Sequence, residues 1–103
     1  MRKNFRTYKL SVEFYHGCIA LNLPTHLKTQ LNRAASSVAL NLAEGSGRRS
    51  RKEQRRFYDI AFASLRECQA VLDLSHEPNK DLASIADKLA ASTYCLMRAL
   101  ARG

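Results

Sequence analysis

The chain has 103 residues, of which 46% are hydrophobic and 25% are charged, with only four glycines and two prolines. This length suits one packed domain over residues 1–103 but not two, and the composition excludes a disordered or turn-rich chain. Seventeen Lys and Arg against nine Asp and Glu leave a formal charge of +8, which favours an anionic partner.

The cysteines and histidines do not form a recognisable chemical motif. Three widely spaced cysteines without a C-x-x-C pair exclude a disulfide framework and a zinc motif, and the three histidines lack the spacing of metal ligands. No apolar run is long enough to cross a bilayer. We therefore expect a cytoplasmic, non-enzymatic protein with no catalytic residue, metal or cofactor, whose cysteines are buried as small apolar residues: Cys18, Cys68 and Cys95.

The first predicted helix covers about residues 4–22 and ends before Pro24. Along it, apolar residues recur in steps of three and four, which is the spacing of one helix face: Phe5, Tyr8, Val12, Tyr15 and Ile19. We expect this face to pack in the core. Thr25 is the predicted N-cap of the next helix, since its hydroxyl can accept from a free backbone N–H.

The second predicted helix ends at Gly45, which is expected to adopt the left-handed conformation that terminates many helices. Its apolar face consists of residues at the same spacing: Leu27, Leu31, Ala34, Val38 and Leu42. Alanines beside this face would allow a neighbouring helix to approach closely. Glu44 is unfavourably placed for the helix dipole, and we expect it to pair with Arg48 or Arg55.

A capping box at Ser50 and Glu53 predicts the start of the third helix. Its apolar face comprises Phe57, Ile60, Ala61, Leu65, Cys68, Val71 and Leu72. Turn-forming residues at 75–79 end this helix, and Asn79 can cap a fourth. The fourth helix carries its own apolar face: Leu82, Ile85, Leu89, Ser92, Leu96 and Leu100. Four helices with short connections predict an all-α, up-down-up-down four-helix bundle.

A basic run at the start of the third helix is the strongest functional signal. Six of the nine residues 48–56 are Arg or Lys: Arg48, Arg49, Arg51, Lys52, Arg55 and Arg56. Cations oppose the dipole at a helix N-terminus, so their position is unfavourable unless an anion binds there. Arginine can also hold a phosphate with two hydrogen bonds. These six residues are therefore the candidate contacts to a nucleic acid, RNA or DNA.

The other basic residues and the aromatic residues are weaker indications of function than the basic run. Two smaller basic groups lie near the chain ends: Arg2, Lys3, Arg6 and Lys9, then Arg98 and Arg102. No zinc-finger or leucine-zipper spacing is present, so readout by shape and charge is expected. At helical spacing most aromatic residues belong to the core, with Phe14 and Tyr58 predicted to be exposed. Glu67 is predicted to be a surface residue, with a polar contact between helices or subunits as the alternative.

Three other interpretations of the positive charge stay open. The basic run can be a solvated face without a partner, which is as well supported as nucleic-acid binding. It can dock an acidic protein, which would make the chain an oligomeric scaffold. Binding to a membrane surface is least favoured, because the apolar face of the third helix is needed in the core.

The segment Ser37–Arg48 (SVALNLAEGSGR), followed by Ser50, Lys52–Glu53 and Phe57–Leu65, resembles a known family. It is similar to the four-helix-bundle proteins encoded in 23S rRNA intervening sequences, which include the accessory variability determinant of diversity-generating retroelements. The resemblance covers about residues 31–72 and rests on an N-A-E-G-x-G-R core, in which Leu42 here stands between Asn and Ala.

This resemblance implies a basic, ring-like homo-oligomer, a homopentamer, that binds RNA or DNA. In the retroelement branch it also implies a partner, a reverse transcriptase. The six residues of the basic run match the basic body of that family and are carried over as polyanion contacts. The fourth helix is shorter than in longer members, which puts a C-terminal partner surface in doubt.

Overall fold

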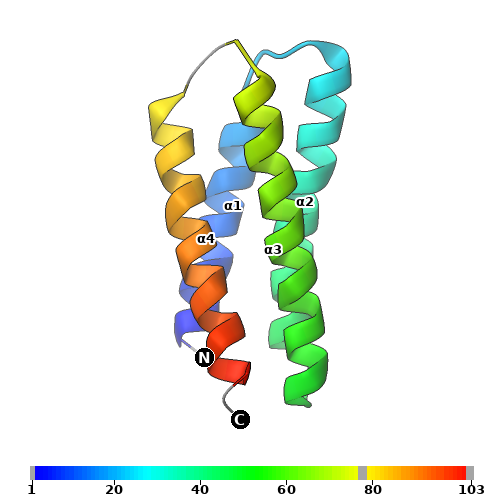
Figure 1. Cartoon of the computed structure of the whole chain (residues 1–103), viewed down its shortest axis with the longest axis vertical. Helices are drawn as coiled ribbons and strands as arrows, with labels where there is room; N and C mark the ends of the chain where they lie inside the picture. Colours follow the sequence, from blue (N-terminus) through cyan, green and yellow to red (C-terminus); the bar gives the residue numbers. More distant parts are fainter. Residues whose placement is uncertain (1, 77–78, 102–103) are drawn as a thin grey trace.

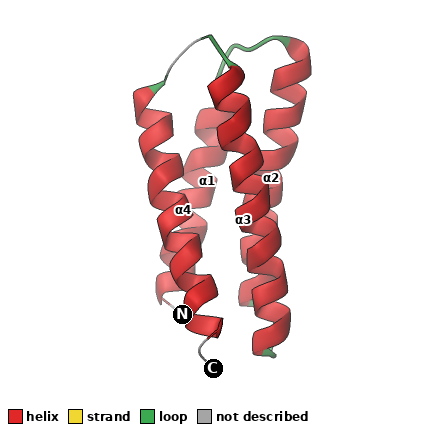
Figure 2. Cartoon of the chain, viewed as in Figure 1, coloured by secondary structure: helices red, strands yellow, loops and turns green. Residues whose placement is uncertain are grey.

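The computed structural model describes residues 2–76 and 79–101, with side chains from residue 4 onward in these ranges. Within them the chain forms four helices: α1 (Arg2–Ile19), α2 (Thr25–Ser46), α3 (Arg51–Leu74) and α4 (Lys80–Ala101). Each helix runs antiparallel to the one before it (Figures 1 and 2). α1 and α3 each pack against both α2 and α4, and the bundle measures 42 × 21 × 18 Å. The predicted all-α four-helix bundle is confirmed.

All four helices contribute to one continuous core. Its largest fully buried apolar side chains include Phe14 from α1, Leu31 from α2, Leu65 from α3 and Leu89 from α4. The predicted apolar faces of α2, α3 and α4 supply most of the remaining core, because their spacing matches the helix period. Ile60 is the main exception in α3, since 38% of its surface is exposed.

The predicted core face of α1 is wrong. Each side chain that α1 buries completely lies one position before a member of the predicted face: Thr7, Ser11, Phe14 and Cys18. One position corresponds to a rotation of about 100° around the helix axis. Phe14 is therefore buried rather than exposed, whereas Phe5 is 61% and Tyr8 38% exposed.

Small hydroxyl side chains explain this rotation. The Thr7 hydroxyl hydrogen-bonds that of Ser92 on α4, and the Ser11 hydroxyl donates to the backbone carbonyl of Tyr8, 2.6 Å away. Buried polar groups are tolerated when they are hydrogen-bonded, so these hydroxyl side chains can lie on the core-facing side of α1. The more apolar face of α1 is consequently left partly at the surface.

The turn between α1 and α2 corrects two predicted boundaries. α1 ends at Ile19 rather than near residue 22, and the Lys28 ammonium donates to the carbonyls of Ile19 and Leu21 at 2.9 and 2.8 Å. This cation satisfies the Ile19 carbonyl, which the end of α1 leaves free, and the Leu21 carbonyl in the turn. Thr25 is not the N-cap: Pro24 occupies that position without a side-chain bond, and Thr25 is the first helical residue.

The end of α2 also differs from the prediction. The helix continues through Gly45 to Ser46, and Gly47 follows it with φ −89°. Gly45 therefore has no left-handed conformation; instead it is buried, and a Cβ added there would lie 2.7 Å from Tyr58 Cε1. Tyr58 is only 2% exposed, so its predicted exposure was wrong. The glycine allows the Tyr58 ring on α3 to pack against the α2 backbone.

The starts of α3 and α4 agree with the predictions. The Ser50 hydroxyl accepts from the backbone N–H of Glu53 at 3.0 Å, and the Asn79 amide oxygen accepts from that of Leu82 at 2.9 Å. The capping box predicts a contact between the Glu53 carboxylate and the Ser50 backbone N–H, but this carboxylate pairs with Arg56, 3.4 Å away. Both helix starts are thus fixed by side-chain caps.

Candidate nucleic-acid interface

The antiparallel order of the helices gathers four segments at one end of the bundle. These are the start of α1, the end of α2, the start of α3 and the end of α4 (Figure 1). We call this half of the molecule the basic end. Its described Lys and Arg side chains are Arg6, Lys9, Arg48, Arg49, Arg51, Lys52, Arg55, Arg56 and Arg98. The structure does not describe the side chains of Arg2, Lys3 and Arg102.

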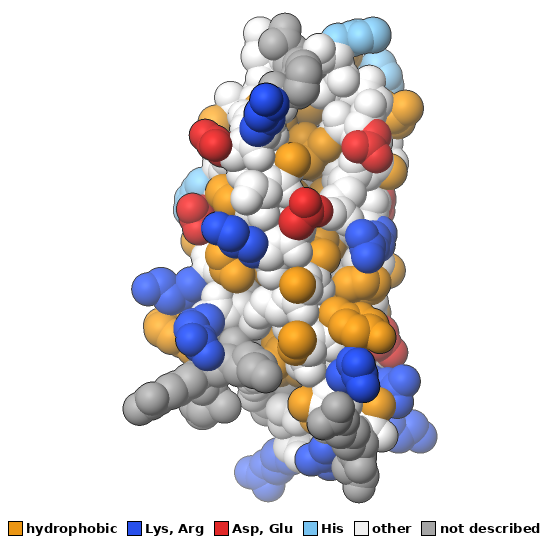
Figure 3. Space-filling view, turned by 60° about the vertical axis from the view of Figure 1, so that its left-hand side comes forward, with side chains coloured by type: hydrophobic (Ala, Val, Ile, Leu, Met, Phe, Trp, Pro, Cys, Tyr) orange, Lys and Arg blue, Asp and Glu red, His pale blue; other side chains and the backbone are white. Residues whose placement is uncertain are grey.

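Acidic side chains offset little of this charge. The described acidic residues of the basic end are Glu44, Glu53 and Asp59. In the opposite half, the described Lys and Arg are balanced one for one by acids: Lys28, Arg33, Arg66, Lys80 and Lys88 against Glu13, Glu67, Asp73, Asp81 and Asp87. Figure 3 shows most blue side chains towards the lower end of the bundle and most red ones above. The positive excess is therefore confined to one end.

Three of the six predicted contact residues are engaged within the protein. Arg48 pairs with Glu44, as predicted, and its guanidinium lies 4.9 Å from the centre of the Phe57 ring. Arg56 lies on the same ring at 4.5 Å. Arg51 donates from Nη2 to the carbonyl of Ala99 at 2.8 Å, which ties the start of α3 to the end of α4. Each of these contacts holds a guanidinium in place.

The other three residues are Arg49, Lys52 and Arg55, which we call the free cations. All three are exposed, and they have no hydrogen bond or ion pair within the part of the chain that the structure describes. Arg49 lies in the turn after α2, whereas Lys52 and Arg55 lie in the first two turns of α3. A cation without a protein partner keeps its full capacity to bind phosphate.

The sequence pattern identified the basic run but not this division. The Arg48–Glu44 pair spans four residues of chain and was predicted, but the Arg51–Ala99 bond joins residues 48 positions apart. Phe57 was assigned to the core and is instead only partly buried beneath two arginines. Glu67 makes the contact between helices, because it pairs with Arg33 at 3.8 Å and accepts from Gln30 at 3.2 Å, both on α2.

The cysteine side chains differ in their surroundings. Cys18 and Cys68 are buried as predicted, but Cys95 is exposed on α4, which contradicts its predicted burial. Burial raises the pKa of Cys18 to about 12 and also raises that of Cys68, so both stay protonated thiols at neutral pH. Among the described residues, no three His, Cys, Asp or Glu side chains gather in a way that could hold a metal ion.

None of the described helices has an apolar stretch long enough to cross a bilayer.

Comparison with known proteins identifies one relationship. A family model described as "23S rRNA-intervening sequence protein" matches residues 3–102. No significant match was found among curated proteins or among solved structures. The match extends the resemblance of residues 31–72 to nearly the whole chain, including α1 and α4. The chain therefore belongs to the 23S rRNA-intervening sequence protein family.

Proposed function

We propose that this chain is a non-catalytic, cytoplasmic accessory protein that binds RNA or DNA through its basic end. The observation that carries the proposal is the set of free cations, Arg49, Lys52 and Arg55, within the positive half of the bundle. Phosphates neutralised by such residues release counterions from the nucleic acid, which supplies affinity without base recognition. The proposed readout is therefore shape and charge.

The proposal extends to assembly and to a protein partner. The chain is proposed to form a ring-like homopentamer and to assist the reverse transcriptase of a diversity-generating retroelement. This part is supported by the resemblance of its N-A-E-G-x-G-R-like segment to that family. Five basic ends in one ring would act together on a single polyanion. Weak contacts by each copy would then add to a high overall affinity.

A salt titration with matched variants tests the nucleic-acid part. Binding to a structured RNA and to duplex DNA is measured for the native chain and for the triple variant Arg49→Ala, Lys52→Ala, Arg55→Ala. The control is Arg48→Ala, Arg51→Ala, Arg56→Ala, which removes the same charge from engaged residues. Each B-DNA phosphate contact contributes about 0.9 to the log–log salt slope, so the first variant should lose up to about 2.7 per chain.

The outcomes separate nucleic-acid binding from its alternatives. The proposal requires tight binding at low salt, and the control variant must retain more of the slope than the variant of the free cations. Equal losses in the two variants would mean that charge alone matters and that the free cations have no special role. If the native chain binds neither nucleic acid at low salt, the basic end docks an acidic protein instead.

A further inference from the structure

The exposed phenylalanine and tyrosine side chains lie in the same half of the molecule as the positive charge. Among the described residues they are Phe5, Tyr8 and Tyr94, which all belong to the basic end. Tyr94 on α4 is 50% exposed. Large apolar rings beside cations are the combination with which proteins bind unpaired bases and their phosphates.

Tyr94 belongs to a row of side chains along the groove between α3 and α4. Two hydrogen bonds fix the alignment of these helices: Arg51 to the Ala99 carbonyl, and Gln69 Nε2 to Asp87 Oδ1 at 3.4 Å. On α3, Phe62 and Arg66 follow Arg55 by seven and eleven positions and therefore lie on the same helix face. On α4, Arg98 follows Tyr94 by four positions and shares its face. We call this row the α3/α4 strip: Arg55, Phe62, Arg66, Tyr94 and Arg98.

Contacts within the α3/α4 strip leave a ring surface available. The rings of Tyr94 and Phe62 lie 6.3 Å apart and are tilted by 47°. The Arg66 guanidinium covers Phe62 at 4.8 Å and donates to Gln69 Oε1 at 2.8 Å. Phe62 is thus partly covered by Tyr94 and Arg66, whereas half of the Tyr94 surface faces solvent. This exposed half of Tyr94 is the surface that a planar ligand would contact.

We propose that the α3/α4 strip binds single-stranded nucleic acid, with an unpaired base stacked on Tyr94 and phosphates contacted by Arg55 and Arg98. The inference rests on the proposed function and specifies its ligand, because bases within a duplex have no free face to offer. Stacking tolerates any base, which agrees with readout that does not depend on sequence. Base stacking on Tyr94 and phosphate contacts from the two arginines act on the same strand.

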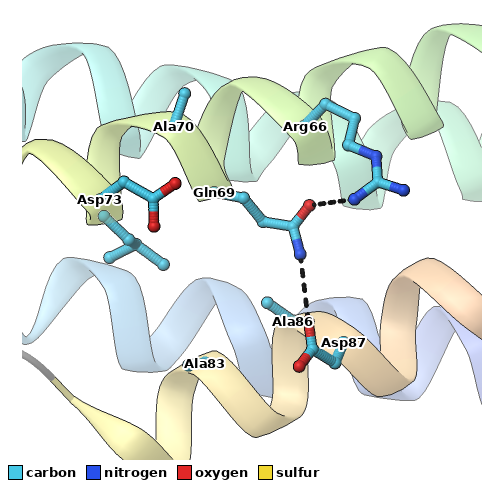
Figure 4. A pocket seen from close by; sticks show the side chains of 8 residues that line it. Arg66, Gln69, Ala70, Asp73, Ala83, Ala86 and Asp87 are labelled. Atoms are coloured by element: carbon cyan, nitrogen blue, oxygen red, sulfur yellow. Dashed lines mark hydrogen bonds between the residues drawn. The ribbon is translucent and has the colours of Figure 1, made fainter.

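The surrounding charges limit the length of the bound segment. Arg55 and Arg66 are eleven residues apart on α3, about 16 Å, which is the length of about five nucleotides at the 3.4 Å spacing of a fully stacked strand and of fewer in an extended one. Beyond Arg66 the groove opens into a hollow of about 400 Å³ with Asp73 and Asp87 on its walls (Figure 4). These carboxylates repel phosphates, so the strand is expected to end there. Asp59 is the one acidic residue beside the strip on α3.

The experiment compares a fluorescent single-stranded hexanucleotide containing 2-aminopurine with its duplex. Single-strand binding should exceed duplex binding and quench 2-aminopurine, which reports stacking. Tyr94→Ala should weaken single-strand binding by at least about fivefold and abolish quenching, while Tyr94→Phe retains both. Leu74→Ala also truncates an exposed apolar side chain, but in the half opposite the basic end. This variant should match the native chain in single-strand affinity and in quenching. Asp59→Asn should strengthen single-strand binding at low salt.

Several outcomes would overturn the inference. Equal affinity for single strand and duplex, with no effect of Tyr94→Ala, would remove Tyr94 from the interface while leaving the proposed function intact. Absence of binding to both ligands would contradict the proposed function itself. Light scattering is run on each variant, and a Tyr94→Ala protein that changes its oligomeric state without losing quenching would assign Tyr94 to a subunit contact. Circular dichroism verifies that each variant is folded.

Discussion

At the scale of single residues, Gly45 determines how closely α2 and α3 approach at the basic end. Gly45→Ala places a methyl group 2.7 Å from Tyr58 Cε1 and 3.1 Å from Phe57 Cβ. Overpacking of this kind costs about 1–3 kcal/mol, and the better helix propensity of alanine recovers only part of it. We expect the free energy of unfolding to fall by about 1–2 kcal/mol in urea denaturation.

Gly47→Ala is the matched control for this substitution. A Cβ at Gly47 would lie 3.6 Å from the Glu44 carbonyl, and its φ of −89° suits any residue. The alanine reduces the freedom of the unfolded chain, so we expect unchanged or slightly higher stability, by up to about 1 kcal/mol. A stable Gly45→Ala protein beside a destabilised Gly47→Ala protein would contradict the packing described here.

Sequence spacing alone could not distinguish the roles of these glycines. Gly45 has the position of a helix-ending glycine, and only the Tyr58 ring from α3 shows that it serves close packing. The same limit applies to the basic run: its existence is evident in the sequence, but Arg51 is engaged by a carbonyl 48 residues away. Local contacts such as Arg48–Glu44 were predictable because both partners lie on one helix.

At the scale of the helices, the two side-chain caps should contribute measurable and independent stability. Ser50→Ala and Asn79→Ala each remove an acceptor from a helix start, and each should cost about 1 kcal/mol. The caps lie at opposite ends of the bundle, so the double variant should show the sum. Thr25→Ala is the control and should change little, since Thr25 makes no cap bond. Thermal and urea unfolding would measure all four proteins.

The orientation of α1 shows where helix periodicity fails. Period and length identified the helix, but two faces were possible, and the more apolar one lies only partly against the core. The buried face is held by hydroxyl groups, with Thr7 bonded to Ser92 on α4 and Ser11 bonded to its own helix. A bond between residues 85 positions apart cannot be inferred from the local pattern of α1.

At the scale of the whole molecule, the exposed face of α1 offers a surface for the proposed homopentamer. Phe5 and Tyr8 line a hollow of about 320 Å³ together with Ala43 and Ser46 of α2. Burial of such side chains in a subunit contact is favourable by about 25 cal/mol for each Å². We expect Phe5→Ser with Tyr8→Ser to convert the oligomer into smaller species in light scattering, with helicity retained.

Leu74→Ser controls for the loss of an exposed apolar residue elsewhere, because Leu74 is 67% exposed at the far end of α3. It should leave the oligomer intact. A native chain that stays monomeric at all concentrations would contradict the proposed assembly, and an intact pentamer in the double variant would place the contact on another surface.

The fold was the most predictable property, since four periodic segments with short connections allow few arrangements other than an antiparallel bundle. The charge distribution follows from that topology, because helix order determines which basic segments meet. Both were therefore predictable from the sequence, whereas side-chain partners across helices were not.

The confinement of positive charge to one end makes the molecule an electric dipole directed along its 42 Å axis. In the field of a polyanion, a torque turns the basic end forward before contact, so that an encounter begun in the wrong orientation can still succeed. The Debye length is about 8 Å at physiological salt, much shorter than the bundle, so this reorientation occurs only during the final approach. The balanced half then points away from the polyanion and stays accessible to a second macromolecule.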